Sequence, residues 1–424
     1  MILKRFWKLI ALSLVIIIVL VTYFIYTSLV VAKQFPELTL KTIDGDKSVM
    51  NDVLLVGEYD GKSNYSTVTV STEGSVYRGQ MSFFENLESP FAINNATKLK
   101  EKYRNFMRGK WIYTGNFFEN DEFVAYVTVK STSSRLHYED AENYFYVDVL
   151  NKETNKSNSF EIKIPGQGLY YDIVVSDVQL VNGELKVLTE SNHYGNAGRY
   201  VRELMVYTID ISSHKISADD PLLVSESVED ANNWEDIMFL NDSEDISEQK
   251  FYFLQKDQNR REVEGTELET EIVDNEPTEI SVVNRSFYLY DLESKELQEV
   301  IFDKEIANEL LDARTWGFVQ DRQVYLVYEL ENTVTILEIN EQDLSVQSKA
   351  KFNLDDSGFR GLSNLTIVND KMYAIGNKDD VNSGKVFVGA IHNGEVLFEG
   401  EIGMENPDEE NEEHELRFYR LIMN

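Results

Sequence analysis

The sequence predicts an all-β fold of repeated small antiparallel sheets, preceded by a single apolar helix. Strand-turn-strand segments recur along the chain, one long apolar run lies near the N-terminus, and helical periodicity is rare elsewhere. Hydrophobic residues make up 42 % and aromatic residues 12 % of the 424 residues. These fractions are well above those of disordered chains, so most of the chain is expected to fold.

The apolar run near the N-terminus decides where the chain is expected to lie. Leu9–Ala32 contains no charged residue. At about 1.5 Å per residue, a helix of this length covers roughly 36 Å, which is enough to cross a bilayer. Lys4, Arg5 and Lys8 precede the run, and this bias of cations favours a cytoplasmic N-terminus.

The domain boundaries follow from this run. Residues 1–8 are predicted to be cytoplasmic, residues 9–32 to form a transmembrane signal anchor, and residues 33–424 to form an extracellular domain held at the cell membrane. The alternative is a cleaved signal peptide, with Val30 and Ala32 as the small residues of a weak cleavage pattern. The anchor is favoured because the run exceeds the usual signal-peptide core of about 7 to 15 residues.

Charge and cysteine content exclude several classes of ligand and site. The chain has 40 basic and 74 acidic residues, which give a formal net charge of −34. Such a charge repels nucleic acid and anionic lipid headgroups at long range, so neither is an expected ligand. The absence of cysteine excludes disulfides, thiolate metal sites and a cysteine nucleophile. A large exported domain without disulfides is typical of Gram-positive bacteria.

One hairpin pattern recurs along the chain. In "YLYDLESKELQEV", Tyr288–Val300, an alternating strand leads to Asp291, an aliphatic residue, a polar turn and a second strand. Similar segments have Asp148, Asp210 and Glu338 in the acidic place, and weaker versions lie near Glu73 and Asn393. Six such segments indicate a repeated hairpin.

Further strand pairs lie between these hairpins, around Asn182, Asp321 and Asn369. One pair plus one hairpin makes a four-stranded sheet, and Asp291 and Glu338 are 47 residues apart. The segment "YLYDLESKEL" in this setting resembles the hairpin between the third and fourth strands of β-propeller repeat proteins. The resemblance implies an extracellular β-propeller of six to seven four-stranded blades behind the membrane anchor.

Irregular elements are also predicted. The acidic stretch at about residues 255–280 is expected to be a mobile insert or the tip of a long hairpin. Short helices are expected from Asn95 to Met107, with one apolar face, and around Ile306–Leu311. The terminal segment Leu416–Met423 is expected to pair with the first blade and close the propeller. Three of the four tryptophans are expected in the core, namely Trp111, Trp234 and Trp316.

One segment has the composition of a recognition loop. Glu190–Glu203 is predicted to be a loop that contains two glycines and side chains suited to stacking and hydrogen bonding. The candidate ligand-binding residues are Asn192, His193, Tyr194 and Arg199. An ordinary connecting loop is the favoured interpretation of this segment, and ligand recognition is the alternative.

Catalytic, cofactor-binding and metal-ligating residues are not identifiable. The five histidines form no close pair, and no Gly-x-Ser-x-Gly motif positions a serine nucleophile. Acidic turns near Asp44, Asp242 and Asp355 lack the spacing of an EF-hand, so they are interpreted as solvated turns rather than calcium sites.

These observations favour a non-catalytic binding or scaffold protein, an accessory or sensory component of a bacterial cell-envelope complex, with a protein or envelope partner. The alternative is a cell-surface hydrolase that acts on carbohydrate or another wall polymer through carboxylates in the propeller channel. A third hypothesis is a propeller that holds a quinone or a similar cofactor.

Overall fold

The structure is a computed structural model of the whole chain. It describes residues 7–8, 11–19, 22, 35–62, 64–81, 95–132, 142–166, 170–194, 199–228, 232–241, 245–261, 280–320, 323–354, 359–378, 382–406 and 414–423. These residues form an all-β fold of six antiparallel sheets, as the sequence predicts. The chain divides into two compact units: unit 1 comprises Met1–Ile93 and Phe352–Asn424, and unit 2 comprises Asn94–Lys351.

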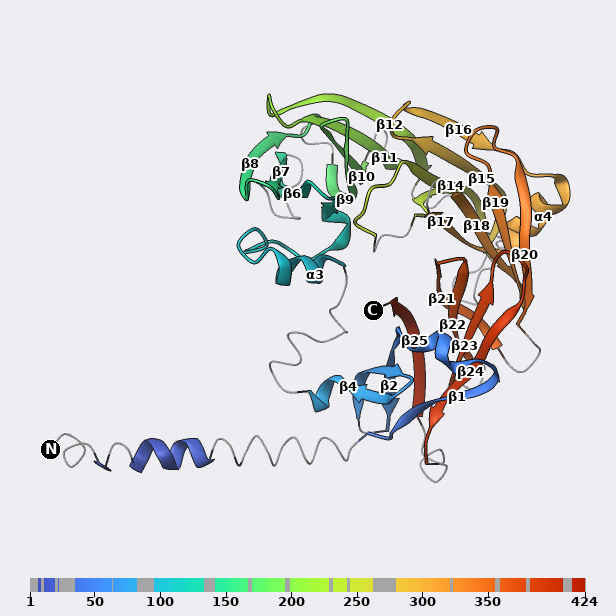
Figure 1. Cartoon of the computed structure of the whole chain (residues 1–424). Helices are drawn as coiled ribbons and strands as arrows, with labels where there is room; N and C mark the ends of the chain where they lie inside the picture. The colour runs from blue at the N-terminus through green and yellow to red at the C-terminus, as the bar shows by residue number, and fades with distance from the viewer. Residues whose placement is uncertain are drawn as a thin grey trace, which may run out of the picture. The chain divides into compact units, whose positions relative to one another are not determined.

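Unit 1 contains two sheets (Figure 1). The first has, in order across the sheet, β25 (His414–Met423), β2 (Val53–Gly61), β3 (Tyr65–Ser71) and β4 (Gly74–Tyr77). The second has β1 (Leu38–Gly45), β24 (Val396–Met404), β23 (Gly384–Ala390), β22 (Lys371–Lys378) and β21 (Phe359–Val368). Each sheet therefore combines strands from the two ends of the chain.

The two ends of the chain exchange strands between these sheets. The N-terminal strand β1 pairs with β24, with Leu38 opposite Met404. The C-terminal strand β25 pairs with β2, with Val53 opposite Met423. The predicted pairing of the terminal segment with the first sheet is confirmed. In addition, the N-terminal strand β1 joins the second sheet, whose other strands come from the C-terminal part of the chain.

Phe418 in β25 packs between the two sheets of unit 1. Its side chain is fully buried in a cluster that also contains Leu55 from the first sheet and Val386 from the second. A Cβ atom added to Gly57 would lie 2.7 Å from the ring, and one added to Gly384 would lie 2.5 Å from it. Glycine at both positions therefore makes the space that this ring fills.

Unit 2 contains four sheets, each formed by four consecutive strands. They comprise β5 (Phe117–Glu119), β6 (Phe123–Ser131), β7 (Asn143–Asn151) and β8 (Lys156–Lys163); β9 (Tyr170–Val181), β10 (Glu184–Tyr194), β11 (Arg199–Asp210) and β12 (Lys215–Val228); β13 (Asn233–Phe239), β14 (Phe251–Arg261), β15 (Ile280–Asp291) and β16 (Glu296–Val300); and β17 (Arg314–Gln320), β18 (Gln323–Leu330), β19 (Thr333–Ile339) and β20 (Val346–Asn353). Short helices complete the described elements, namely α3 (Asn95–Lys102), α4 (Lys304–Asp312) and the 3₁₀ segments Lys47–Met50, Arg78–Gln80 and Thr114–Asn116.

All six predicted hairpins are present, and each joins the last two strands of a meander. The turn after Asp291 shows why the pattern recurs. The Asp291 carboxylate accepts hydrogen bonds from the backbone N–H groups of Glu293 at 2.8 Å and Ser294 at 3.3 Å. Lys295 then adopts a left-handed conformation with φ of 60°. In the turn these N–H groups have no carbonyl of a neighbouring strand to bond to. A short side chain before the turn accepts their hydrogen bonds instead.

Asp148 and Glu338 were predicted to hold the position of Asp291 before the turn, and both predictions were wrong. The side chains that cap the corresponding turns are Asn151, which accepts from the backbone of Thr154, and Asn340, which accepts from the backbone of Gln342. Asp148 and Glu338 lie earlier, inside β7 and β19. The asparagine amide oxygen caps the turn in the same way as a carboxylate, so an acidic residue is not required.

The start of the predicted insert is part of the sheet. β14 continues to Arg261, and residues 262–279 lie outside the described residues. Asp257 in β14 is buried because Arg285 in β15 donates to both of its carboxylate oxygens, at 2.8 and 2.9 Å. Arg285 also donates to the backbone carbonyls of Leu310 and Ala313 at the end of α4, both at 2.6 Å.

Both predicted short helices are present. The carboxylate of Asp303 caps the start of α4 by accepting from the N–H groups of Glu305 and Ile306. The helix α3 begins at Asn95 but ends at Lys102, before the predicted end at Met107.

Residues 7–8, 11–19 and 22 of the N-terminal segment are helical, and the rest of the predicted anchor lies outside the described residues. Within the part of the chain that the structure describes, no helix combines the length and apolar character needed to cross a bilayer.

Candidate functional site

The predicted recognition segment is a strand pair rather than a loop. Asn192, His193 and Tyr194 end β10, and Arg199 begins β11, so the structure brings these four residues to the end of one hairpin. The prediction of a loop over Glu190–Glu203 was wrong, because the alternating side chains of this segment extend the β10–β11 ladder.

Several polar groups of this hairpin interact within their own sheet. The Tyr200 hydroxyl donates to the Asn192 side-chain oxygen at 2.8 Å, and its ring contacts Tyr194 edge to face at 6.1 Å between centroids. Arg199 pairs with Glu226 in β12 at 2.8 Å. A ligand-binding role for Asn192, His193, Tyr194 and Arg199 stays a prediction.

A basic segment in unit 2 offers a second candidate site, which sequence reasoning missed. Residues 95–110 contain six basic residues and one acidic residue in a chain of net charge −34. The basic residues are Lys98, Lys100, Lys102, Arg104, Arg108 and Lys110. This local reversal of charge was visible in the sequence, but only the apolar face of the helix was recognised.

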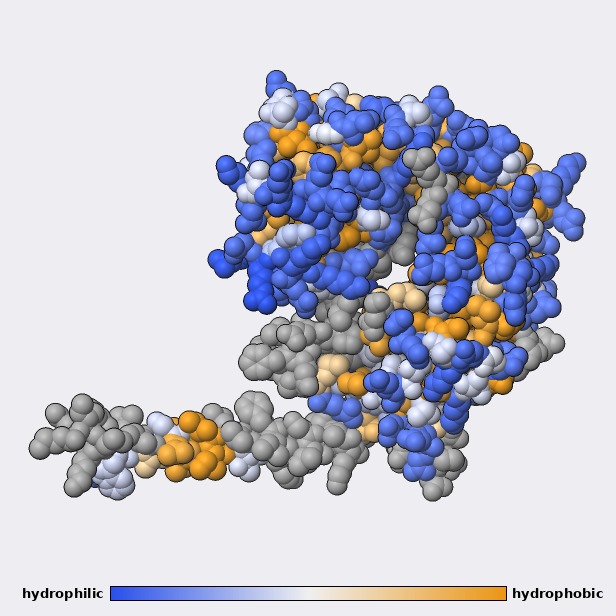
Figure 2. All heavy atoms as spheres, viewed as in Figure 1, coloured by the Kyte–Doolittle hydropathy of each residue, from blue (hydrophilic) through white to orange (hydrophobic). Residues whose placement is uncertain are grey.

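Apolar contacts hold the basic segment against the sheet of β5 to β8. Leu99, Phe106 and Met107 are buried in one cluster, as the predicted apolar face requires. After α3, the N–H of Met107 donates to the carbonyl of Tyr103 at 3.0 Å, so the chain continues in a helical turn. Figure 2 shows mainly hydrophilic side chains on the surface around α3.

A groove with a volume of about 640 Å³ runs beside this turn. This volume lies in the range of small-molecule sites. The basic side chains that line it are Lys102, Arg104, Arg108 and Lys110; the others include Glu101, Asn105, Tyr146, Asp148, Asn155 and Ser157. Four cations and two carboxylates therefore face one groove.

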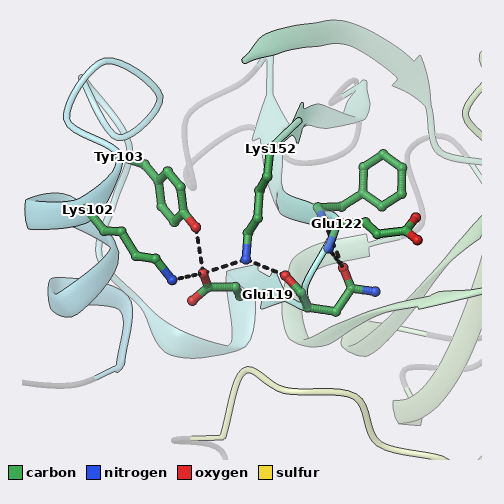
Figure 3. A network of polar contacts seen from close by, with 7 residues as sticks. Lys102, Tyr103, Glu119, Glu122 and Lys152 are labelled. Carbon is green, nitrogen blue, oxygen red and sulfur yellow. Dashed lines mark hydrogen bonds and ion pairs between the residues drawn. The ribbon is translucent and has the colours of Figure 1, made fainter. Parts of the chain in front are cut away.

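Glu119 at the end of β5 fixes one end of the basic segment. One carboxylate oxygen accepts hydrogen bonds from Lys102 at 2.7 Å, from the Tyr103 hydroxyl at 2.8 Å and from Lys152 at 2.7 Å. Figure 3 shows these three side chains converging on Glu119. Lys152 also donates to the backbone carbonyl of Asn120.

The contacts between Glu119 and Lys102 shift the pKa values of these two groups in opposite directions. Burial raises the pKa of Glu119, but the hydrogen bonds from Lys102, Lys152 and Tyr103 outweigh burial and the pKa is lowered overall. The bond to Glu119 raises the pKa of Lys102. Glu119 is therefore a carboxylate at neutral pH, and it neutralises part of the charge of Lys102.

Lys110 and Asp148 form a buried ion pair under the groove. Their side chains are only 6 % and 8 % exposed, and Lys110 donates to Asp148 at 2.6 Å. Ser159 donates to the second oxygen of Asp148 at 2.8 Å. The Lys110 ammonium also lies 3.8 Å from the centre of the Phe106 ring. Asp148 is thus a structural partner of Lys110 rather than an available acid or base.

Arg104 and Arg108 differ from the two lysines. Both are exposed, and neither side chain makes a hydrogen bond or ion pair with any residue that the structure describes. Both side chains line the groove beside this turn. Two guanidinium groups are therefore available to a ligand of the groove.

The three tryptophans predicted in the core are not all buried. Trp111, which follows Lys110, is 76 % exposed, whereas Trp234 and Trp316 are partly buried. Trp111 is the most exposed large hydrophobic side chain among the described residues. Its prediction as a core residue was wrong, because the apolar cluster beneath the basic segment is already filled by Phe106 and Met107.

Asp177 in β9 is the carboxyl group with the most unusual environment away from the groove. Burial raises its pKa to about 7, although hydrogen bonds from Tyr252, the Val178 backbone and Gln179 act in the opposite direction. The Tyr252 hydroxyl, from β14, donates to Asp177. The carboxyl thus joins β9, an edge strand of one sheet, to β14 of the next sheet of unit 2.

The described residues offer no group of three or more His, Asp or Glu side chains that could hold a metal ion. The acidic turn near Asp44 is stabilised internally, since the Asp46 carboxylate accepts from the backbone and side chain of Ser48. The groove, in contrast, presents donors and positive charge, so its chemistry suits the binding of an anion.

No protein-family model and no curated protein matches this chain. Among solved structures, the apocarotenoid oxygenase of Synechocystis has a TM-score of 0.38 at 6 % identity and covers 86 % of this chain and 92 % of its own. Dipeptidyl peptidase 4 of Porphyromonas gingivalis has a TM-score of 0.30 at 10 % identity, over 63 % of this chain and 45 % of its own. The Dos1 propeller has a TM-score of 0.28 at 12 % identity, over 61 % and 55 %.

Proposed function

We propose that this chain is a membrane-anchored, extracellular β-propeller of six blades that acts as a non-catalytic binding protein of the cell envelope. Its ligand is an anionic envelope component that binds in the groove beside residues 95–110. The four cations of the groove, with Arg104 and Arg108 unpaired among the described residues, carry this proposal.

The sheet pattern supports the propeller. Four consecutive antiparallel strands form each sheet of unit 2, and the two sheets of unit 1 exchange their terminal strands. A propeller is built from such four-stranded sheets, and strand exchange between its first and last blades covers edges that would otherwise be open.

The N-terminal helix supports the membrane anchor. Its large apolar side chains between residues 12 and 19 are each 50–61 % exposed. Figure 2 shows this segment as a hydrophobic surface. An exposed apolar helix is costly in water and favourable in lipid, and the preceding Lys4, Arg5 and Lys8 fit the cytoplasmic side.

The groove supports binding rather than hydrolysis. Polymer hydrolysis by carboxylates needs one acid and one base that are free to exchange protons. Of the two carboxylates at the groove, Asp148 is held by Lys110 and Ser159. The groove's chemistry is therefore mainly that of fixed positive charge and hydrogen-bond donors, which bind an anion without altering it.

Site-specific photo-crosslinking in cells tests this function. A photo-reactive residue at Ser157, in β8 beside the groove, is expected to form an envelope adduct with the full chain. Ser348 is a matched control because it is also an exposed serine on the last strand of a four-stranded sheet. Adduct formation at Tyr194 but not at Ser157 would instead favour the hairpin of β10 and β11.

The adduct at Ser157 should also depend on charge. Replacing Arg104 and Arg108 by Gln is expected to reduce its yield at least tenfold, since two charge-assisted contacts are removed. Equal yields at Ser157 and Ser348 would contradict a ligand site in this groove.

A further inference from the structure

We infer that Gln179 in β9 is a positioning residue of the groove and acts on it through the connection between β13 and β14. This inference rests on the proposed function and names what holds the same site in place. Residues Asp245–Gln249 of this connection form what we call the strap. Among the described residues, those that line the groove include neither Gln179 nor any part of the strap, so an effect on binding passes through other residues.

Gln179 holds the strap with both ends of its side-chain amide. The amide nitrogen donates to the backbone carbonyl of Ser247 at 3.1 Å, and the amide oxygen accepts from the backbone N–H of Gln249 at 2.9 Å. Both glutamines are buried. A side-chain amide that donates and accepts in this way takes the place of a neighbouring strand, so it fixes the strap on β9.

The strap reaches the basic segment through Ile246. This side chain is buried in the same apolar cluster as Leu99, Phe106 and Met107, which hold the segment against the sheet of β5 to β8. Among the described members of this cluster, Ile246 is the one that lies outside residues 96–150. The connection of another sheet therefore supports the apolar side of the segment that carries the arginines.

The strap also holds the end of β5, where Glu119 lies. The backbone N–H of Glu119 donates to the carbonyl of Ile246 at 2.8 Å, and the side chain of Asn120 donates to Glu248 at 2.8 Å. The carboxylate of Glu119 in turn holds one end of the basic segment. Two routes thus lead from the strap to this segment, one through apolar contacts and one through hydrogen bonds.

The placement of Arg104 and Arg108 depends on these routes. In the sequence the two arginines flank Phe106, which is buried in the cluster that Ile246 completes. Binding is tighter when the contacting groups are held in place before the ligand arrives, because less conformational freedom is then lost. Release of the strap should therefore weaken binding although no charge is removed from the groove.

Hydrogen exchange of the full chain in a neutral detergent, measured by mass spectrometry without any ligand, tests the inference. The amides of Tyr103, Met107 and Lys110 report on the basic segment, because they donate within its helical turns. Gln179→Leu leaves the N–H of Gln249 without its acceptor. The three amides should then exchange about tenfold faster, since an unpaired buried polar group favours release of the strap and local opening of the segment.

Gln255→Leu is the matched control for a merely structural effect. Gln255 is also buried in unit 2, donates to the carboxylate of Asp257 and accepts from the Thr315 hydroxyl. Neither of these hydrogen bonds reaches the strap. This variant should also lose stability, but it should change exchange in the basic segment by less than about twofold.

Ile246→Ala tests the apolar route, and it replaces Gln179→Leu if that variant does not fold. It removes the side chain from the cluster and keeps the backbone carbonyl that accepts from Glu119. Exchange at the same three amides should again rise about tenfold. Ile246→Val keeps most of the apolar contact and should restore most of the protection.

Two exchange results would overturn the positioning role. One is equal acceleration of the basic segment by Gln179→Leu and Gln255→Leu. The other is the absence of acceleration in both Gln179→Leu and Ile246→Ala.

The photo-crosslink at Ser157 keeps this inference apart from the proposed function. The yield of the adduct should fall about fivefold in Gln179→Leu, because the arginines are no longer held in place. An adduct that forms with unchanged yield in this variant would contradict control of binding by the strap. If exchange responds as expected but the unaltered chain forms no adduct, the proposed function is wrong and the positioning of the basic segment by Gln179 is supported.

Discussion

Unit 1 and unit 2 are built from the same kind of antiparallel sheet but are assembled from the chain in different ways. Unit 1 joins chain segments from both termini, and one apolar cluster with Phe418 between two glycines links its two sheets. Unit 2 is formed by consecutive strands. Among the described residues, the two ion pairs in which neither side chain is more than 8 % exposed, Lys110–Asp148 and Arg285–Asp257, both lie in unit 2.

This difference corresponds to two tasks: unit 1 joins the two ends of the chain, and unit 2 carries the candidate binding groove. Apolar contacts fill space without specifying a ligand, and they suit a region whose task is to hold the chain ends together. Charged groups that are buried need specific partners, and such partners position neighbouring charged groups. The groove of unit 2 depends on this, because Glu119 and Asp148 hold Lys102 and Lys110 in place and leave the arginines available.

Substitution in the apolar core of unit 1 is expected to have the largest effect. Phe418→Ala should lower the free energy of unfolding by about 3 to 5 kcal/mol, because it opens a cavity between the two sheets. Guanidinium unfolding followed by circular dichroism measures this. Tyr419→Ala is the control. The Tyr419 side chain, next to Phe418 in the sequence, is 44 % exposed, so this substitution should change stability little. Similar losses in the two variants would disprove the role given to Phe418.

Breaking the buried ion pair in unit 2 is expected to have a somewhat smaller effect. Arg285→Met leaves the Asp257 carboxylate buried without its charge partner and should cost about 3 kcal/mol. The loss stays near this value because Gln255 still donates to Asp257 at 2.9 Å. The same unfolding experiment measures it, with Arg199→Met as control, because the pair of Arg199 and Glu226 is about half exposed.

Comparing the two core variants sharpens the contrast between the units. If Phe418→Ala and Arg285→Met lower the midpoint of one shared transition, the two units unfold together. If each variant shifts a different transition, the units unfold separately, and each substitution changes the stability of its own unit only.

The third expected effect is a change in the pH dependence of the stability of unit 2. The pKa of Asp177 is about 7 in the folded chain and its ordinary value is 3.8. Between these values the folded state binds more protons than the unfolded state, so this carboxyl lowers stability as pH rises from about 4 to 7. Above pH 7 its contribution is constant.

Asp177→Asn removes this titration and keeps an acceptor for the Tyr252 hydroxyl. Its melting temperature should therefore fall less between pH 5 and pH 8 than that of the unaltered chain. Thermal unfolding at intervals of one pH unit provides the measurement. Parallel curves for the two proteins would show that Asp177 does not titrate in this range.

Much of the sheet structure could be predicted because turn chemistry is local. Asp291 and the turn after it lie within a few residues of each other, so the hairpin is readable from sequence alone. The misassigned turns at Asp148 and Glu338 show the limit of such reading. Asn151 and Asn340 cap those turns equally well, and only the hydrogen bonds distinguish the candidates.

The candidate site was less predictable because it depends on distant partners. The six cations between residues 95 and 110 are visible in the sequence. Their pairing is not: Lys110 meets Asp148, which lies 38 positions away, and this contact decides which cations remain available. Trp111 illustrates the same limit, since its residue type suggests burial but its place in the cluster is already occupied.

The strand exchange in unit 1 sets the order in which the chain acquires its structure. Lys41 in β1 donates to the carbonyl of Met404 in β24, 363 positions later. At about 5 to 20 residues per second, a ribosome needs on the order of half a minute to make the intervening chain. Throughout that time the earliest strands lack their neighbours and expose pairing edges. A nascent chain of this kind depends on being kept from premature association until its last residues emerge.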